Sequence, residues 1–376
     1  MGGAARSTHE LAAVLLERDH HCATLMTSDT EVATIRRHKR ILNLSVKSQR
    51  HQATEILRPA VEFVRSRIGA HRVRDVTRAY PAWTSALPEN ALNATILKFR
   101  PDIVVTNSIE RPAWRQIRDL CVMHRIPTVF YIREASGVRH LIDPPSPPDL
   151  LLANAEAHAI EARVAGFDCA VVPSVVNTER SRVTSQRTHV VLVNPVPIYG
   201  VELAIEIAAC CPEIPFTFVE SWPLSDRERL ELDDRCTDLG NCELLPFQAD
   251  ARNIYRHARA MLMLCTVPSR PRVIPEAQAN GIPVVAVDRP GHGEAVGSGG
   301  ILIDPQAPLT TWVTQLRRLW HDDIHYQQLC DEALRHASRS DATPLAVVQR
   351  FESLVEPLMT QSAKRRPLNR TNDDKP

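Results

Sequence analysis

Short runs of β-branched and aliphatic residues alternate with helix-like patterns through most of this chain. The runs are almost continuously apolar, which is typical of strands that are covered by helices on both faces of a parallel sheet. They occupy residues 22–26, 103–106, 127–132, 150–153, 169–172, 190–193, 216–219, 243–245, 261–265, 284–287 and 301–303. The alternation therefore predicts an α/β protein built on parallel sheets.

The length of 376 residues predicts two domains, because one domain typically takes about 150 residues. A helix end, a proline and a buried strand follow one another in both halves, at Pro127 and at Pro283. A polar, strand-poor stretch at 173–189 separates the halves and suits a hinge. We predict Rossmann-like domains over 1–175 and 186–343, a helix over 344–361 that crosses back to the first domain, and a disordered tail over 362–376.

Composition excludes several classes of protein. The 45 basic residues only just exceed the 44 acidic ones, so binding to nucleic acid through bulk charge is not expected. No apolar run approaches the roughly 20 residues of a membrane helix. Nine cysteines without a C-x-x-C pair, and a start that does not resemble a signal peptide, predict reduced thiols in the cytoplasm.

The beginning of the chain predicts a helix directly behind Gly2 and Gly3. Ser7 and Glu10 have the spacing of a capping box and precede an apolar helical pattern. A doubly wound domain needs a strand before such a glycine-rich turn. We therefore expect that the first strand is missing or that the natural start lies upstream.

The stretch 268–296 contains the densest group of candidate ligand-binding residues. Glu276 falls on a short predicted helix, and Gly291, Gly293 and Glu294 follow the next strand. Loops at the carboxyl ends of parallel strands bind ligands, carboxylates accept sugar hydroxyls, and backbone N–H groups hold phosphates. The pattern favours a polyhydroxyl ligand attached to phosphate, and a set of ordinary turns and caps is the alternative.

Residues 268–294 resemble the C-terminal signature of retaining glycosyltransferases of family 4, also called glycosyl transferases group 1. Four other segments are similar to landmarks of the same family: Gly2-Gly3 with the helix behind it, 101–107, 149–154 and 193–200. The resemblance implies a GT-B fold, in which two Rossmann-like domains have parallel sheets facing across a cleft. It also implies transfer of a sugar from a nucleotide-sugar donor to an unknown acceptor with retention of configuration.

The resemblance assigns roles to individual residues. Arg133 and Glu134 end a buried strand where the family often has a charged pair, although a simple salt bridge is an alternative. Glu276 is expected to hold the ribose hydroxyls unless it only caps its helix, and Arg272 stands at a position that is often arginine. The full set expected at the donor is Gly2, Gly3, Asn194, Tyr199, Gly200, Arg272, Glu276, Gly291, Gly293 and Glu294.

Three positions depart from the family pattern. Pro268 stands where a glutamate usually contacts the donor sugar, and Asn194 and Tyr199 replace the usual arginine and lysine. Positive charge aimed at the departing diphosphate is worth several kcal/mol, since loss of one such donor costs about a hundredfold or more in rate. The alternatives are therefore an active transferase, an inactive binding protein with the same fold, and a sugar-nucleotide epimerase.

We expect no cofactor beyond the nucleotide-sugar co-substrate and no obligatory metal. His321 and His325 share a helix face but lack the third ligand of a zinc site. A basic cluster at 36–40 suggests peripheral contact with a membrane or a phosphorylated acceptor, and a solvated loop is the alternative. Its charged side chains are Arg36, Arg37, Lys39 and Arg40.

Overall fold

A computed structural model describes residues 3–27, 80–85, 88–107, 111–133, 138 and 147–365. Gly2, Glu134 and the basic cluster of Arg36, Arg37, Lys39 and Arg40 lie outside the described residues, so the predictions for them stay predictions. No helix among the described residues has both the length and the apolar character that crossing a bilayer requires.

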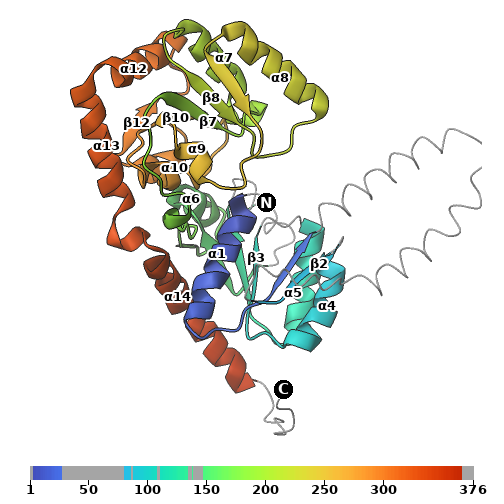
Figure 1. Ribbon diagram of the computed structural model, residues 1–376. Helices are drawn as coiled ribbons and strands as arrows, with labels where there is room; N and C mark the ends of the chain where they lie inside the picture. Colours follow the sequence, from blue (N-terminus) through green and yellow to red (C-terminus); the bar gives the residue numbers. More distant parts are fainter. Residues whose placement is uncertain are drawn as a thin grey trace, which may run out of the picture. The chain divides into compact units, whose positions relative to one another are not determined.

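The described chain alternates strands and helices, as predicted (Figure 1). The strands are β1 (Thr24–Thr27), β2 (Ala82–Ser85), β3 (Val104–Asn107), β4 (Thr128–Ile132), β5 (Leu150–Ala153), β6 (Ala170–Val171), β7 (His189–Val193), β8 (Phe216–Val219), β9 (Cys242–Leu245), β10 (Ala258–Met263), β11 (Val284–Val287) and β12 (Gly300–Ile303). The α-helices are α1 (Gly3–Glu17), α4 (Pro88–Phe99), α5 (Arg111–Met123), α6 (Glu156–Val164), α7 (Val201–Cys210), α8 (Asp226–Leu239), α9 (Arg252–Tyr255), α10 (Val273–Gln278), α11 (His292–Val296), α12 (Leu309–His321), α13 (Asp323–Ala337) and α14 (Pro344–Arg365). Short 3-10 helices are η2 (Thr178–Arg180), η3 (Pro197–Tyr199) and η4 (Ser340–Ala342).

The largest sheet has six strands in the order β12-β11-β10-β7-β8-β9. All neighbouring strands in it are parallel, with Val190 opposite Phe216 and Met261 opposite Val284. This is the doubly wound order of a Rossmann sheet, in which successive connections run outward from β7 in both directions. The order reverses between β7 and β10, and the loops behind these two strands therefore border the usual ligand-binding crevice.

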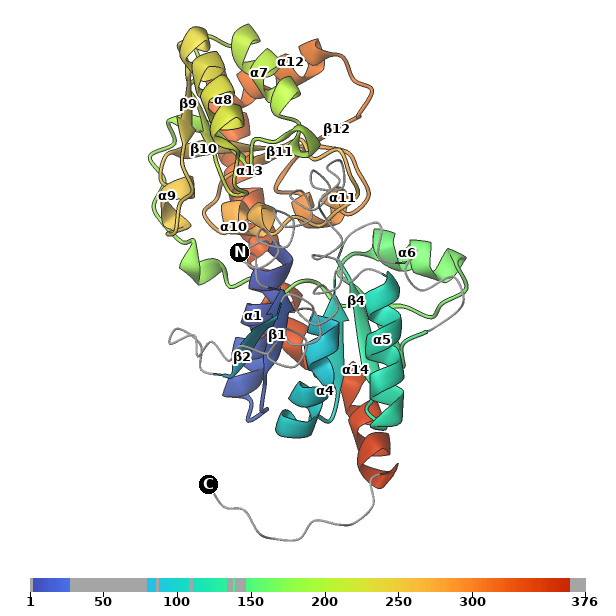
Figure 2. The same ribbon diagram turned by 90° about the vertical axis from the view of Figure 1, so that its right-hand side faces the viewer.

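Alternate residues of the central strand β7 enter two separate cores. Val190 and Leu192 pack with side chains of α7, α8, α12 and α13 in a first cluster. Val191 and Val193 pack with α9, α10 and α11 in a second cluster. The six-stranded sheet is therefore covered by helices on both faces, which explains why its strands read as unbroken apolar runs (Figure 2).

The other described strands form two smaller sheets, one of β1 with β2 and one in the order β3-β4-β5-β6. Strand β2, which the sequence pattern missed, pairs in parallel with β1 from Thr24 opposite Ala82 to Thr27 opposite Ser85. The chain forms two compact units. The first consists of Met1–Leu11, Phe130–Arg139 and Leu150–Ser353, and the second of Ala12–Val129, His140–Asp149 and Leu354–Pro376.

Both ends of the described chain correct a prediction. Helix α1 begins at Gly3, so Ser7 and Glu10 lie inside it and the predicted capping box is wrong. Helix α14 runs to Arg365, so 362–365 are helical and the predicted disorder of these residues is wrong. The remaining tail residues, 366–376, lie outside the described residues. The predicted domain limits and the crossing of the last helix stay predictions.

Candidate functional site

The predicted donor residues that the structure describes belong to the first unit, and all of them except Gly3 follow strands of the six-stranded sheet. Asn194 and Tyr199 come after β7, and Arg272 precedes the short helix α10 after β10. Gly291 leads into α11 after β11. The doubly wound order brings these loops to one edge of the sheet, at the carboxyl ends of the strands.

Arg272 is the centre of a buried ion-pair network. Its Nε donates to Oε1 of Glu276 at 2.9 Å, and its Nη2 donates to both carboxylate oxygens of Glu10 at 2.9 and 3.0 Å. Its Nη1 donates to Ser7 Oγ at 2.9 Å. Burial lowers the pKa of Arg272, but the carboxylates of Glu276 and Glu10 outweigh it and raise the pKa. Ser7 and Glu10, read from sequence as a cap, are thus partners of this arginine.

Glu276 is held on both carboxylate oxygens. Oε1 accepts from Arg272, and Oε2 accepts from the hydroxyl of Tyr255 at 2.9 Å. The Glu276 residue is 4% exposed, and burial raises the pKa of Tyr255 well above its usual value. Tyr255 was not predicted, because its only signal was an apolar helical pattern. Each carboxylate oxygen still has a lone pair for a further donor.

Arg133, at the end of β4, is the least compensated of the predicted cations. It is 9% exposed, its Nη1 donates to Ala4 O at 3.0 Å, and its guanidinium lies 4.4 Å from the ring centroid of Tyr131. Its buried Nε has no hydrogen-bond partner, and the described part of the chain offers it no carboxylate. Burial lowers its pKa, and the nearby positive charge of Arg272 lowers it further. An anion next to Arg133 would relieve this imbalance.

Gly3 lies beside Arg272: a Cβ added to this glycine would be 3.6 Å from the arginine Cδ.

Glu294 is occupied elsewhere, because its carboxylate accepts the backbone N–H groups of Glu156 at 2.8 Å and Ala157 at 3.1 Å. These N–H groups open α6, which has no side-chain cap of its own. The role of Glu294 at a donor therefore stays a prediction.

Two glycines are required by close backbone approach. Gly200 has φ +73°, and a Cβ there would lie 2.5 Å from Leu264 Cβ. Gly291 has φ +90°, and a Cβ there would lie 2.4 Å from the carbonyl oxygen of Ser269. Gly293 has no such restriction, since its nearest neighbour would be Leu302 Cδ1 at 3.6 Å. The loops after β7 and β11 are thus packed directly onto the segment after β10.

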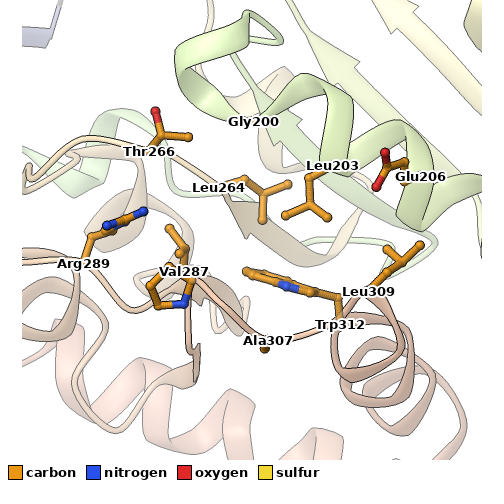
Figure 3. A pocket seen from close by; sticks show the side chains of 11 residues that line it. Gly200, Leu203, Glu206, Leu264, Thr266, Val287, Arg289, Ala307, Leu309 and Trp312 are labelled. Carbon is orange, nitrogen blue, oxygen red and sulfur yellow. The ribbon is translucent and has the colours of Figure 1, made fainter.

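A pocket of about 310 Å³ opens beside Gly200 (Figure 3). Leu203, Leu264 and Trp312 surround its apolar part, and the guanidinium of Arg289 lies at one side. The aliphatic and aromatic side chains of this pocket belong to the first core cluster, whereas Tyr199 packs against the second. The pocket therefore lies on the other side of the β7 loop from Glu276, and Gly200 alone among the predicted donor residues lines it.

His292 fixes the glycine-rich turn as a neutral side chain. Its Nδ1 lies 2.9 Å from Val287 O and therefore carries the proton, so Nε2 accepts from Ser269 Oγ at 3.2 Å. The residue is fully buried, and burial lowers its pKa below the usual value.

The free energy of unfolding should fall as the pH drops below about 6.5, because the unfolded state then binds a proton that folded His292 resists. Each such group contributes a slope of at most about 1.36 kcal/mol per pH unit. The variant His292→Asn keeps an amide that can donate to Val287 O. Its free energy of unfolding, measured with urea, should change less between pH 7 and pH 5 than that of the parent. An unchanged slope would contradict a neutral buried His292.

Comparisons with known proteins agree with this architecture. The model of the family described as Glycosyl transferases group 1 matches residues 208–322. The D-inositol 3-phosphate glycosyltransferase of Corynebacterium kroppenstedtii is 34% identical over 116 residues, which are 29% of this chain and 26% of that protein. The chain thus matches 26% of the length of this curated relative.

Solved glycosyltransferase structures resemble the chain over most of its length. Anabaena HepE, solved in complex with UDP-glucose, has a TM-score of 0.62 and 18% identity, covering 72% of this chain and 82% of HepE. A glycosyltransferase from Rickettsia africae has a TM-score of 0.65 and 13% identity, covering 97% of this chain and 96% of its own. At these identities the likeness concerns the fold. The resemblance to glycosyl transferases group 1 is thus confirmed over residues 208–322, and the chain has the predicted α/β fold of the GT-B glycosyltransferases with Rossmann-like domains.

Proposed function

We propose that the chain is a glycosyltransferase that moves a sugar from a nucleotide-sugar donor to an acceptor with retention of configuration. The observation that carries the proposal is the family match over 208–322, which falls on the doubly wound sheet with β7 at its switch point. The fold relationship to a structure named as a complex with UDP-glucose supports a nucleotide-sugar as the ligand class.

In this proposal the buried network prepares the donor site. Glu276, oriented by Arg272 and Tyr255, accepts ribose hydroxyls with its remaining lone pairs. Arg133, whose charge has no carboxylate partner among the described residues, meets an anionic group of the donor or acceptor. A fixed cation near a departing diphosphate lowers the barrier because negative charge grows there as the glycosidic bond breaks. Retention then requires the departing phosphate and the acceptor to share one face of the sugar.

The proposal needs neither a metal nor a protein nucleophile. It places the protein in the cytoplasm, with a glycan, a lipid-linked sugar or a small molecule as acceptor. Contact with a membrane surface through Arg36, Arg37, Lys39 and Arg40 belongs to the same proposal, and it would bring the site to a lipid-linked acceptor.

A non-catalytic relative that binds nucleotides is the second candidate. The observation that favours it is the loss of positive charge at Asn194 and Tyr199, because neither side chain can replace a cation at neutral pH. Burial moreover raises the pKa of Tyr199 to about 12, so this side chain stays a neutral phenol.

Thermal unfolding with UDP-, GDP- and ADP-sugars tests the proposal. A ligand that binds only the folded state at a hundredfold excess over Kd stabilises it by about 2.7 kcal/mol, which raises Tm by several degrees. One nucleotide class should shift Tm, and inorganic phosphate should not. Radiolabelled sugar transfer to acceptor extracts then separates the transferase from the non-catalytic relative. A cooperative transition that no nucleotide-sugar shifts would overturn both.

A further inference from the structure

An aromatic residue follows each of three neighbouring strands. Tyr199 follows β7, Trp222 follows β8 and Phe247 follows β9, and these strands are adjacent in the sheet. Trp222 is 43% exposed and Phe247 is 57% exposed. This end of the sheet is the one where doubly wound sheets bind ligands.

The loop that carries Trp222 is fixed from two sides. Oδ1 of Asn194 accepts the backbone N–H of Trp222 at 2.9 Å. The carboxylate of Glu220 accepts the N–H of Leu224 at 3.1 Å and is itself held by Arg229 at 2.7 and 2.9 Å. Side-chain hydrogen bonds thus hold the backbone at Trp222 and at Leu224. They fix the loop that carries the indole, which preorganises it for a ligand.

Tyr199 supports the indole without covering it. The two ring centroids are 5.3 Å apart and the ring planes make an angle of 85°. Such an edge-to-face contact occupies at most one face of either ring. Asn194 and Tyr199, the two positions that depart from the family's basic pair, therefore both contact Trp222.

A donor remains unused at the same place. Nδ2 of Asn194 is buried, the residue is 4% exposed, and this nitrogen has no hydrogen-bond partner in the described part of the chain. A buried unpaired amide N–H is costly, and a ligand with carbonyl or ring-nitrogen acceptors would satisfy it. The strand ends thus offer a ligand an aromatic ring and a neutral hydrogen-bond donor. The nearby cation Arg229 is already paired with Glu220.

We propose that Trp222 stacks on the nucleobase of the donor, so that this chain recognises its nucleotide through the base. The inference rests on the proposed function and deepens it. A nucleobase fits because it is planar and uncharged and has acceptors at its edge, and stacking on an aromatic residue contributes about 1–3 kcal/mol per base.

Calorimetric titration with UDP, GDP and ADP, and with the matching nucleosides, tests the stacking. Trp222→Leu should lower the affinity for the best-binding nucleotide and the affinity for its nucleoside by the same factor, roughly ten- to hundredfold. Trp222→Phe should recover most of the affinity because it retains a stacking ring. The control is Leu230→Ala, which removes an exposed apolar side chain on α8. This variant should bind the nucleotide as tightly as the parent does. The Tm of each variant without ligand verifies folding.

The outcomes separate the two proposals. If the parent chain binds a nucleotide and Trp222→Leu binds it equally well, the stacking is wrong and the proposed function stands. If Trp222→Leu weakens binding of inorganic phosphate or free glucose as much as of the nucleoside, the indole does not recognise the base. If the parent binds no nucleotide at all, both proposals fail.

Discussion

Arg272→Met should lower the free energy of unfolding by about 3–5 kcal/mol, because it leaves two buried carboxylates without their shared cation. Glu10 and Glu276 have side chains that are 3% and 5% exposed, so water cannot replace the guanidinium. Urea denaturation at pH 7 measures the loss.

Arg235→Met is the matched control. Arg235 also makes a bidentate ion pair, with Glu202 at 2.9 and 2.6 Å, but the two side chains are 43% and 63% exposed. Solvent screens this pair, so its loss should cost about 1 kcal/mol or less. Equal losses for the two variants would show that the Arg272 network contributes no more than a surface pair.

Gly200→Ala should destabilise the first unit by several kcal/mol, in two parts. The left-handed backbone at φ +73° costs an alanine about 1–2 kcal/mol. The new Cβ would also lie 2.5 Å from Leu264 Cβ and 2.7 Å from Leu264 O, and relieving such overlap typically costs a further 1–3 kcal/mol or so. Chemical denaturation measures this loss of stability, and a changed affinity for nucleotide would accompany it.

Gly240→Ala is the matched control for the first part, the backbone cost. Gly240 has the same φ of +73°, and nothing lies within 4 Å of its added Cβ. It should therefore show the backbone cost alone, and the difference between the two variants measures the contact of the β7 loop with Leu264. A Gly200→Ala variant no less stable than Gly240→Ala would mean that the loop gives way freely.

The strands were predictable because burial on both faces leaves an unbroken apolar run. Strand β11 has all four of its residues buried, and the run 284–287 matched it to the residue. Strand β2 lacked this signal, since its residues Ala82, Trp83, Thr84 and Ser85 end in two hydroxyl side chains. Its place depends on pairing with β1, which no local pattern encodes.

The site was predictable in its positions but not in its contacts. Ser7 and Glu10 have the spacing of a local cap, yet their partner Arg272 is 265 and 262 residues away. The sequence alone suggests that Glu276→Ala leaves the unliganded protein's stability nearly unchanged. The buried bonds to Arg272 and Tyr255 instead predict a loss of stability as well as of nucleotide protection.

The departures from the family were visible in sequence, but their structural use was not. Asn194 and Tyr199 indicated only that two positive charges are missing. Trp222 belongs to no motif, and it lies beside them because β8 pairs with β7. Such a contact depends on strand order, which residue spacing along the chain does not contain.

The distance in sequence between Glu10 and Arg272 also orders events during synthesis. A ribosome that adds about 5–20 residues per second exposes Glu10 on the order of tens of seconds before Arg272. Throughout that interval α1 carries the Glu10 carboxylate while its partner Arg272 has not yet been synthesised. The first and the last thirds of the nascent chain must therefore meet after translation of the middle third, and slow elongation would prolong the time in which the N-terminal segment is open to chaperones and proteases.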